Sequence, residues 1–171
     1  MKKIITVFCI LLSFVIISFS QDAKADKKKE KATLITTAVI DSQHYEFRPL
    51  TAIPMAGEVR NLTYGFVVTI SKDTIESYLP YFGRAYSVDY GSTTSPLEFI
   101  SANFGYSVQN LKKGGWDIAI EPKDAKEIRK LLFTIYPNGN ASLQVICNNR
   151  QPINFQGEIN AVKLKKEKEV Q

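Results

Sequence analysis

LLFTIYPNGNASLQVIC, residues 131–147, is the stretch that decides the fold. Apolar residues fall at alternate positions on both sides of Asn138-Gly139, and a period of two is typical of a half-buried β-strand. Asn-Gly accepts the positive φ angles of a tight turn, so the two runs are predicted to pair as an antiparallel hairpin. Cys147 shares one face of the returning strand with Leu143 and Val145, which predicts a small buried side chain rather than a nucleophile or metal ligand.

The same alternation recurs from Tyr45 to the end of the chain. Residues 61–79 are predicted to form a second hairpin, with Leu62–Ile70 as its first strand and a turn at Ser71-Lys72-Asp73. Many short strands joined by turns indicate a mainly β fold, a single antiparallel β-sandwich or barrel of about 8–10 strands. Periodicity does not separate sandwich from barrel. The remaining strands are expected around 97–101, 104–108, 116–120 and 153–159.

Residues 26–41 are compatible with two structures. Asp26 can cap a helix, and Leu34, Ala38 and Asp41 fall at helical spacing. Most residues of 33–40 are β-branched, however, and β-branched residues lower helix propensity. We predict a short N-terminal helix, with a strand as the alternative.

The first twenty residues have the features of a secretory signal. Lys2 and Lys3 precede an apolar run over 4–19, and small residues allow cleavage near Ser20. The run is shorter than the about 20 residues that span a bilayer. We therefore expect an exported protein, periplasmic or extracellular, with no transmembrane segment after signal removal. A retained membrane anchor is the alternative.

The net charge of +5 is concentrated in the two ends of the chain. Residues 33–160 hold eleven Lys and Arg against twelve Asp and Glu, so the body is near neutral. Because a nucleic-acid binder places its positive charge on the folded face, we exclude nucleic acid as a partner. The expected organisation is a signal (1–20), a charged tail or helix start (21–32), a single β-rich domain (33–160) and a Lys/Glu-rich C-terminal tail (161–171).

Residues 78–86, YLPYFGRAY, combine four aromatic residues with a proline, a glycine and an arginine. This run, called the aromatic–Arg run below, resembles the hallmark of the DUF4251 family, exported proteins of unknown function found mainly in Bacteroidetes. The resemblance implies a charged helical stretch before the first strand, and it implies no activity or ligand. Weaker similarities extend it over about 45–159, namely YEF at 45–47 with Pro54, NLT at 61–63, GGW at 114–116, NGNASL at 138–143, and NNRQPI at 148–153 with FQG at 155–157.

The aromatic–Arg run is the candidate contact surface. Arg84 could bind a carboxylate, phosphate or sugar, with Tyr81, Phe82 and Tyr86 as stacking walls. Arg150, in a polar turn, has the same potential. The alternative for both arginines is a structural role, such as an ion pair between Arg84 and Asp89.

Catalytic, metal-binding and cofactor-binding residues are not predicted. His44 is the only histidine and lacks a recognisable oriented partner, while Trp116 and Tyr106 fit core positions. The leading hypothesis is an exported, non-enzymatic binding or accessory domain whose partner is a small molecule, glycan or envelope protein. A protein-interaction or structural envelope protein is the first alternative. A two-carboxylate hydrolase is the second, drawing on Glu46, Glu58, Glu76, Asp89, Glu98, Asp117 and Glu121.

Overall fold

The computed structural model describes residues 36–63, 65–86, 95–112 and 114–162, and in these residues ten antiparallel strands form one sheet. The sheet curls into a nearly closed barrel, which confirms the predicted mainly β, antiparallel fold. The order of strands across the sheet is β5-β4-β3-β1-β10-β9-β8-β7-β6, with β2 paired to β1. In chain order the strands are β1 (Tyr45–Pro54), β2 (Arg60–Asn61), β3 (Val67–Ile70), β4 (Ile75–Tyr78), β5 (Phe99–Ser101), β6 (Phe104–Asn110), β7 (Trp116–Pro122), β8 (Ile128–Ile135), β9 (Asn140–Cys147) and β10 (Ile153–Ala161).

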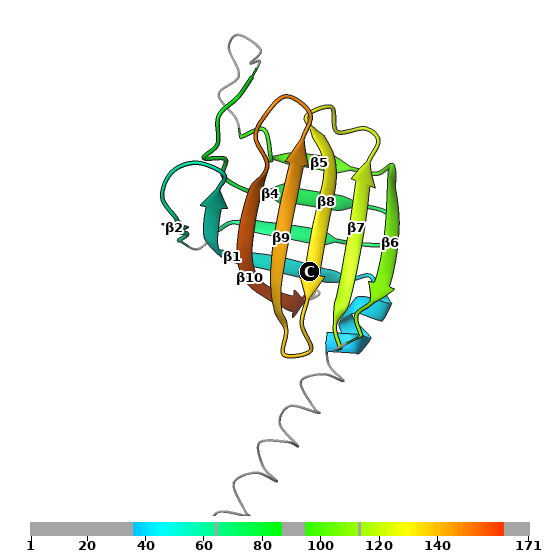
Figure 1. Ribbon diagram of the computed structural model, residues 1–171. Helices are drawn as coiled ribbons and strands as arrows, with labels where there is room; N and C mark the ends of the chain where they lie inside the picture. The colour runs from blue at the N-terminus through cyan, green and yellow to red at the C-terminus, as the bar shows by residue number, and fades with distance from the viewer. Residues whose placement is uncertain (1–35, 64, 87–94, 113, 163–171) are drawn as a thin grey trace, which may run out of the picture.

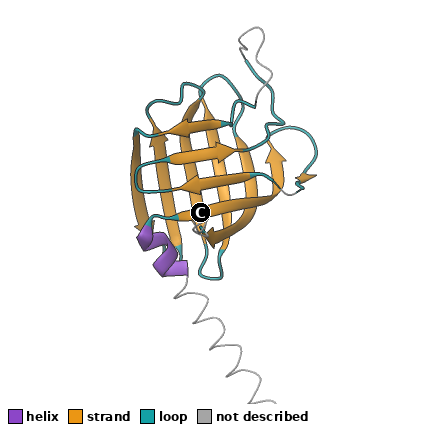
Figure 2. Cartoon of the chain, turned by 180° about the vertical axis from the view of Figure 1, so that it is seen from behind, coloured by secondary structure: helices purple, strands orange, loops and turns teal. Residues whose placement is uncertain are grey.

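The sheet folds over into two layers (Figure 1). Strands β10, β9, β8, β7 and β6 lie side by side in one layer, and β1, β3, β4 and β5 run across behind them. Figure 2 shows the second layer from the opposite side. Strand β1 belongs to both layers, because it pairs with β10 along its length and with β3 over Tyr45–Phe47. The two ends of the sheet, β5 and β6, are joined by a short turn.

Apolar side chains from both layers fill the space between them. Phe47 of β1 packs edge-on against Phe133 of β8, with ring centroids 5.6 Å apart. Trp116 and Cys147 are buried as predicted, and Tyr106 packs against the core as a partly buried residue. Burial of this kind contributes roughly 25 cal/mol per Å² of apolar surface and is the main force holding the layers together.

The two predicted hairpins are confirmed. At the β8–β9 turn, the Tyr136 amide donates to the Asn140 carbonyl at 2.8 Å, and Gly139 adopts a φ of +88°. At the β3–β4 turn, the Ser71 amide donates to the Thr74 carbonyl at 2.8 Å. The first strand of this second hairpin is shorter than predicted, because Gly65 adopts a φ of +121° and interrupts the alternating run before Val67.

One irregularity of β1 was not predicted. The register between β1 and β10 shifts between Pro49 and Thr51, so Leu50 is an extra residue that bulges outward and is 52% exposed. Opposite the bulge lies Gly157, where a Cβ atom would collide with the carbonyl oxygen of Arg48. The bulge therefore requires a glycine at this position of β10.

A short helix covers one end of the barrel (Figure 2). It is described over 36–42, which agrees with the predicted helix, whereas 26–35 lie outside the described residues. Ile40 is 2% exposed and belongs to the core. The predicted signal at 1–20 and the tail at 21–32 also lie outside the described residues, as does all but the start of the C-terminal tail. Among the described residues, the helix that is present is too short to cross a bilayer.

Candidate functional site

The aromatic–Arg run leaves β4 and folds over one end of the core. Leu79 is 1% exposed, and Tyr81 and Phe82 are partly buried against the core. Tyr78 is 46% exposed and stacks on Phe66 with ring centroids 5.6 Å apart. Three of the four aromatic side chains in the run, Tyr78, Tyr81 and Phe82, thus take part in packing.

The Tyr81 hydroxyl fixes the backbone of this corner. It lies 3.0 Å from the Arg84 carbonyl and 2.9 Å from the Gln151 carbonyl, and it can donate to one of them at a time. The Tyr81 ring lies so close to Gly83 that a Cβ atom there would collide with the hydroxyl. Tyr81 and Gly83 therefore form one structural unit.

The run is tied to the turn between β9 and β10 by backbone bonds. Ala85 and Arg150 form an isolated β-bridge. On its two sides the Tyr86 amide donates to the Asn149 carbonyl at 2.9 Å and the Gln151 amide donates to the Arg84 carbonyl at 3.0 Å. The structure thus brings Arg150 together with the predicted contact residues Tyr81, Arg84 and Tyr86, from which it is far apart in the sequence.

The two arginines differ in their surroundings. The Arg150 Nε lies 3.4 Å from the Glu127 carboxylate, its side chain is 13% exposed, and its guanidinium lies over the Tyr81 ring at 5.6 Å from the centroid. Arg84 is exposed, and its guanidinium has no hydrogen bond or ion pair within the part of the chain that the structure describes. Asp89, the partner that the sequence suggested, lies outside the described residues.

The remaining residues in and around the run are Phe82, Tyr86 and Cys147. Arg60 lies over the Phe82 ring at 4.7 Å from the centroid. Tyr86 is 73% exposed. Cys147 at the end of β9 is close enough to Tyr81 to interact with it electrostatically. Burial raises the pKa of the Cys147 thiol to about 11, so the thiolate form is disfavoured at neutral pH. Whether the run contacts a ligand stays a prediction.

Three acids of the hydrolase hypothesis, Glu46, Asp117 and Glu121, are engaged in local contacts, whereas Asp89 lies outside the described residues. Glu46 accepts from Arg48 at 2.8 Å, and Glu121 is 2.6 Å from Lys130 Nζ, whose hydrogen bond and charge lower the pKa of the Glu121 carboxyl. Asp124, which was not among those acids, accepts hydrogen bonds from the Ser101 hydroxyl and from the amides of Ala102 and Asn103. These bonds, chiefly that from Ser101, lower the pKa of the Asp124 carboxyl. Among the described residues, three or more His, Cys, Asp or Glu side chains do not gather in a geometry that could hold a metal ion.

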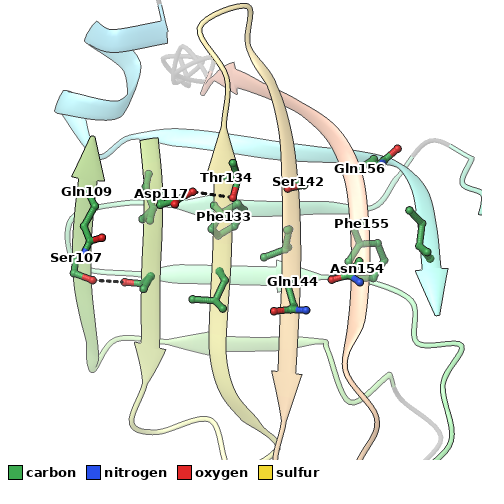
Figure 3. Close-up of a pocket in the computed structure, with 15 residues that line it drawn as sticks. Ser107, Gln109, Asp117, Phe133, Thr134, Ser142, Gln144, Asn154, Phe155 and Gln156 are labelled. Atoms are coloured by element: carbon green, nitrogen blue, oxygen red, sulfur yellow. Dashed lines mark hydrogen bonds between the residues drawn. The ribbon is translucent and has the colours of Figure 1, made fainter. Parts of the chain in front are cut away.

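A hollow on the outer face of β6–β10 was not predicted. Its volume is about 560 Å³, and Figure 3 shows its polar side chains. They occupy the positions that alternate with core residues: Asp117, Thr134 and Ser142 flank the buried Ile118, Phe133 and Leu143. A second hollow of about 520 Å³ adjoins it and shares Ser142 and Gln156.

The strand register arranges these side chains in two rows that cross six strands. The first row contains mostly polar residues and includes a 2.8 Å hydrogen bond from the Thr134 hydroxyl to the Asp117 carboxylate (Figure 3). The second row has an apolar centre formed by Ala119 and Leu132. The first row is Gln109, Asp117, Thr134, Ser142, Gln156 and Thr51. The second row is Ser107, Ala119, Leu132, Gln144, Asn154 and Ile53.

The hollow is almost free of charge. Asp117 is the one ionisable residue in the two rows, and the polar groups otherwise are amides and hydroxyls, which both donate and accept hydrogen bonds. Such a surface can bind a ligand that carries many neutral hydroxyl or amide groups. The alternating sequence signals these residues as outward-facing, but only the strand register places them in rows.

Comparisons with known proteins identify a family and a fold. The chain matches the family model described as "Domain of unknown function (DUF4251)" over residues 26–159. It is similar to the crystal structure of a DUF4251 family protein from Bacteroides eggerthii, with a TM-score of 0.54 and 12% sequence identity. That similarity covers 78% of this chain and 87% of the other. No curated protein matches the sequence.

Proposed function

This chain belongs to the DUF4251 family, whose function is unknown, and from its own surface geometry we propose that it is an exported, non-enzymatic glycan-binding domain. The proposed site is the hollow on the outer face of β6–β10, with the two rows as its floor. The observation that carries the proposal is the neutral, amide-rich and hydroxyl-rich lining of a hollow on the outer face of the sheet.

The chemistry of the rows matches that of a neutral sugar. Sugar hydroxyls donate and accept, and so do the amides of Gln109, Gln144 and Asn154. Ala119 and Leu132 supply an apolar floor on which the C–H face of a sugar ring can pack. Polyanions are poor candidates, because Asp117 is the only charge in the rows and it is negative.

The two rows are poorer in charge than the rest of the same outer face, where Glu121, Lys130 and Glu158 occupy outward positions. Soluble proteins cover such faces with Lys, Arg, Glu and Asp in about a quarter to a third of positions. Asn is depleted in strands because it fits a pleated surface poorly. Asn154 of β10 nevertheless lies in the second row beside Gln144, in a half-buried position. This pattern supports selection for binding rather than for solubility alone.

The length of the rows favours an oligosaccharide over a single sugar. Six neighbouring strands at about 4.8 Å spacing give a track of about 24 Å. The adjoining hollow adds Tyr136, which is 48% exposed and available for stacking on a sugar ring. Glycoside hydrolysis uses a pair of carboxylates, whereas the rows contain only Asp117, so we propose binding without cleavage.

Export is part of the proposal. The basic start, apolar run and small-residue cleavage site of residues 1–20 support it, and they would bring the hollow to the periplasm or the exterior. Polysaccharides of an envelope or of the surroundings are available to the domain there.

The test is calorimetric titration of the purified protein with neutral and with uronic-acid-containing oligosaccharides. We expect binding of a neutral oligosaccharide with little salt dependence, because few charges are involved. Replacing both Gln144 and Asn154 by Ala should weaken binding about tenfold or more, which corresponds to ~1.4 kcal/mol.

The matched control is Glu76→Gln, an exposed position on β4 in the other layer, which should leave the affinity unchanged. Failure of every neutral oligosaccharide to bind would contradict the proposal. An affinity that the Gln144 and Asn154 substitutions do not change would contradict the assigned site.

A second contact surface is supported by the exposure of Arg84 and Tyr86. Arg84 is exposed without a charged partner among the described residues, and Tyr86 is 73% exposed beside it. An acidic small molecule or an envelope protein is the partner this pair fits. Under this alternative Arg84→Ala abolishes binding while the double substitution in the hollow has no effect, so the two sites are separable in one titration series.

A further inference from the structure

Among the described residues, no strand pairs with the outer edge of β6, which is free over most of its length. It pairs with β7 along all seven residues, and it is the last strand of the sheet. Ser107, Val108, Gln109 and Asn110 are all exposed, although successive residues of a strand point to opposite faces. Exposure on both faces means that neither the core nor another described element covers this part of β6.

The hydrogen-bond pattern between β6 and β7 shows which backbone groups of β6 face the open edge. The Leu111 amide donates to the Gly115 carbonyl at 3.0 Å, and the Lys123 amide donates to the Asn103 carbonyl at 2.8 Å. Hydrogen-bonded pairs alternate along an antiparallel ladder, so Ser107 and Gln109 bond to β7. The amides and carbonyls of Tyr106, Val108 and Asn110 therefore point away from β7, toward the edge.

The edge lacks the features with which proteins block unwanted strand pairing. Such features are charged side chains, proline, bulges and very short strands. Residues 104–110, FGYSVQN, contain no charged residue and no proline, and their register with β7 is unbroken. By contrast, β5 at the other end of the sheet has only three residues.

We infer that β6 pairs antiparallel with β6 of a second copy of this chain, around a two-fold axis at Val108. In this register the Val108 residues of the two copies face each other, and Tyr106 faces Asn110 of the partner subunit. All the edge-facing amides and carbonyls of 106–110 then acquire partners, which a free edge leaves to water. Val108, which is 42% exposed, packs against its symmetry mate.

A second copy fits this edge for two reasons. An uncharged strand meets no like-charge repulsion when it pairs with itself, so self-pairing needs no complementary partner. The two rows on the outer face also end on β6, at Ser107 and Gln109. The pairing places Gln109 next to Ser107 of the partner subunit. Two separate hollows then become one polar track across both copies, whatever ligand they bind.

The paired area is small, so the dimer is expected to depend on protein concentration. Sedimentation velocity of the purified protein over a wide concentration range measures the fraction of dimer. We expect dimers that increase with concentration. Val108→Pro removes an edge-facing amide without touching the bonds to β7 and should give monomers. Val108→Thr, which keeps a β-branched uncharged residue, should still dimerise.

A charge swap tests the position of the axis. Val108→Lys and Val108→Glu should each be monomeric alone, because like charges would face each other across the axis, and an equimolar mixture should form heterodimers. Circular dichroism melting checks that each variant is folded. A protein that stays monomeric at every concentration, a dimer that Val108→Pro does not weaken, or a mixture that does not associate would each overturn the inference. Strong hydrogen-exchange protection of the Val108 amide in a monomer would do so as well, since it would assign the edge to a segment of the same chain.

Discussion

The hydroxyls of Tyr45 and Tyr106 lie 3.1 Å apart and join β1 to β6, the strand at one end of the sheet. Tyr45 is fully buried, so its hydroxyl depends on Tyr106 for a hydrogen-bond partner. Tyr106→Phe should lower the free energy of unfolding by about 1–3 kcal/mol, because it leaves a buried polar group unpaired. Urea denaturation measures the change.

The double substitution is the control for this prediction. In Tyr45→Phe/Tyr106→Phe both partners are removed, so the loss should be smaller than the sum of the two single losses. Additive losses would indicate that the two hydroxyls do not interact.

Stability should fall at alkaline pH. Burial raises the pKa of the Tyr45 and Tyr106 hydroxyls, and it raises that of the Cys147 thiol to about 11. Above about pH 8.5 for Cys and about pH 10 for Tyr, the unfolded chain loses protons that the native state retains. The unfolded state then binds fewer protons, so the free energy of unfolding decreases as pH rises.

Denaturation midpoints measured between neutral and strongly alkaline pH test this sign. In the Tyr45→Phe/Tyr106→Phe variant the denaturation midpoint should fall less steeply above about pH 10, because the two hydroxyls with raised pKa values have been removed. A midpoint that rises with pH in this range would contradict the assignment.

The corner at Tyr81 should be structural. Tyr81→Phe removes the hydroxyl that holds the Arg84 and Gln151 carbonyls and should cost about 1 kcal/mol or more. Gly83→Ala should cost at least as much, because its Cβ would collide with the Tyr81 ring. Thermal melting of both variants gives the ranking, and a neutral Gly83→Ala would refute the packing.

The two arginines should respond differently to truncation. Arg150→Ala leaves Glu127 without its ion pair and uncovers Tyr81, so we expect about 1–2 kcal/mol of destabilisation. Arg84→Ala should change stability by less than about 0.5 kcal/mol, because the exposed guanidinium has no charged partner among the described residues. Equal effects in urea denaturation would argue against this division of roles.

Cys147 should be unreactive in the folded protein. The residue is 7% exposed and burial raises the pKa of its thiol, so both access and ionisation limit attack of the thiol on a disulfide reagent. Modification with a chromogenic thiol reagent should be slow in buffer and fast in denaturant. Rapid modification of the native protein would place the thiol at the surface.

Local features of the sequence predicted much of the fold. Asn138-Gly139 correctly predicted the β8–β9 hairpin, and Gly139 adopts the positive φ that the turn requires, whereas Asn138 does not. Alternation identified the buried faces, including Cys147. The bulge at Leu50 was missed, because it depends on the contact between Gly157 and Arg48 across two strands far apart in the sequence.

The candidate contacts were predictable one by one but not as an arrangement. The sequence singled out Tyr81 and Arg150, yet their stacking depends on how the β9–β10 turn meets the end of β4. The rows of the outer hollow were not predicted for the same reason. Gln144 and Asn154 are ordinary outward residues until the register makes them neighbours.

The position of β1 between β3 and β10 sets a condition on how the chain folds. Tyr45 pairs with Ala161, so the first long strand finds its main neighbour in the last one. Until β10 has been made, β1 and β9 both have unpaired edges, and long-range pairing of this kind is slow and exposes the chain to aggregation. A nascent chain that ends before residue 153 therefore cannot complete the barrel, and the native state becomes accessible only after β10 has been made.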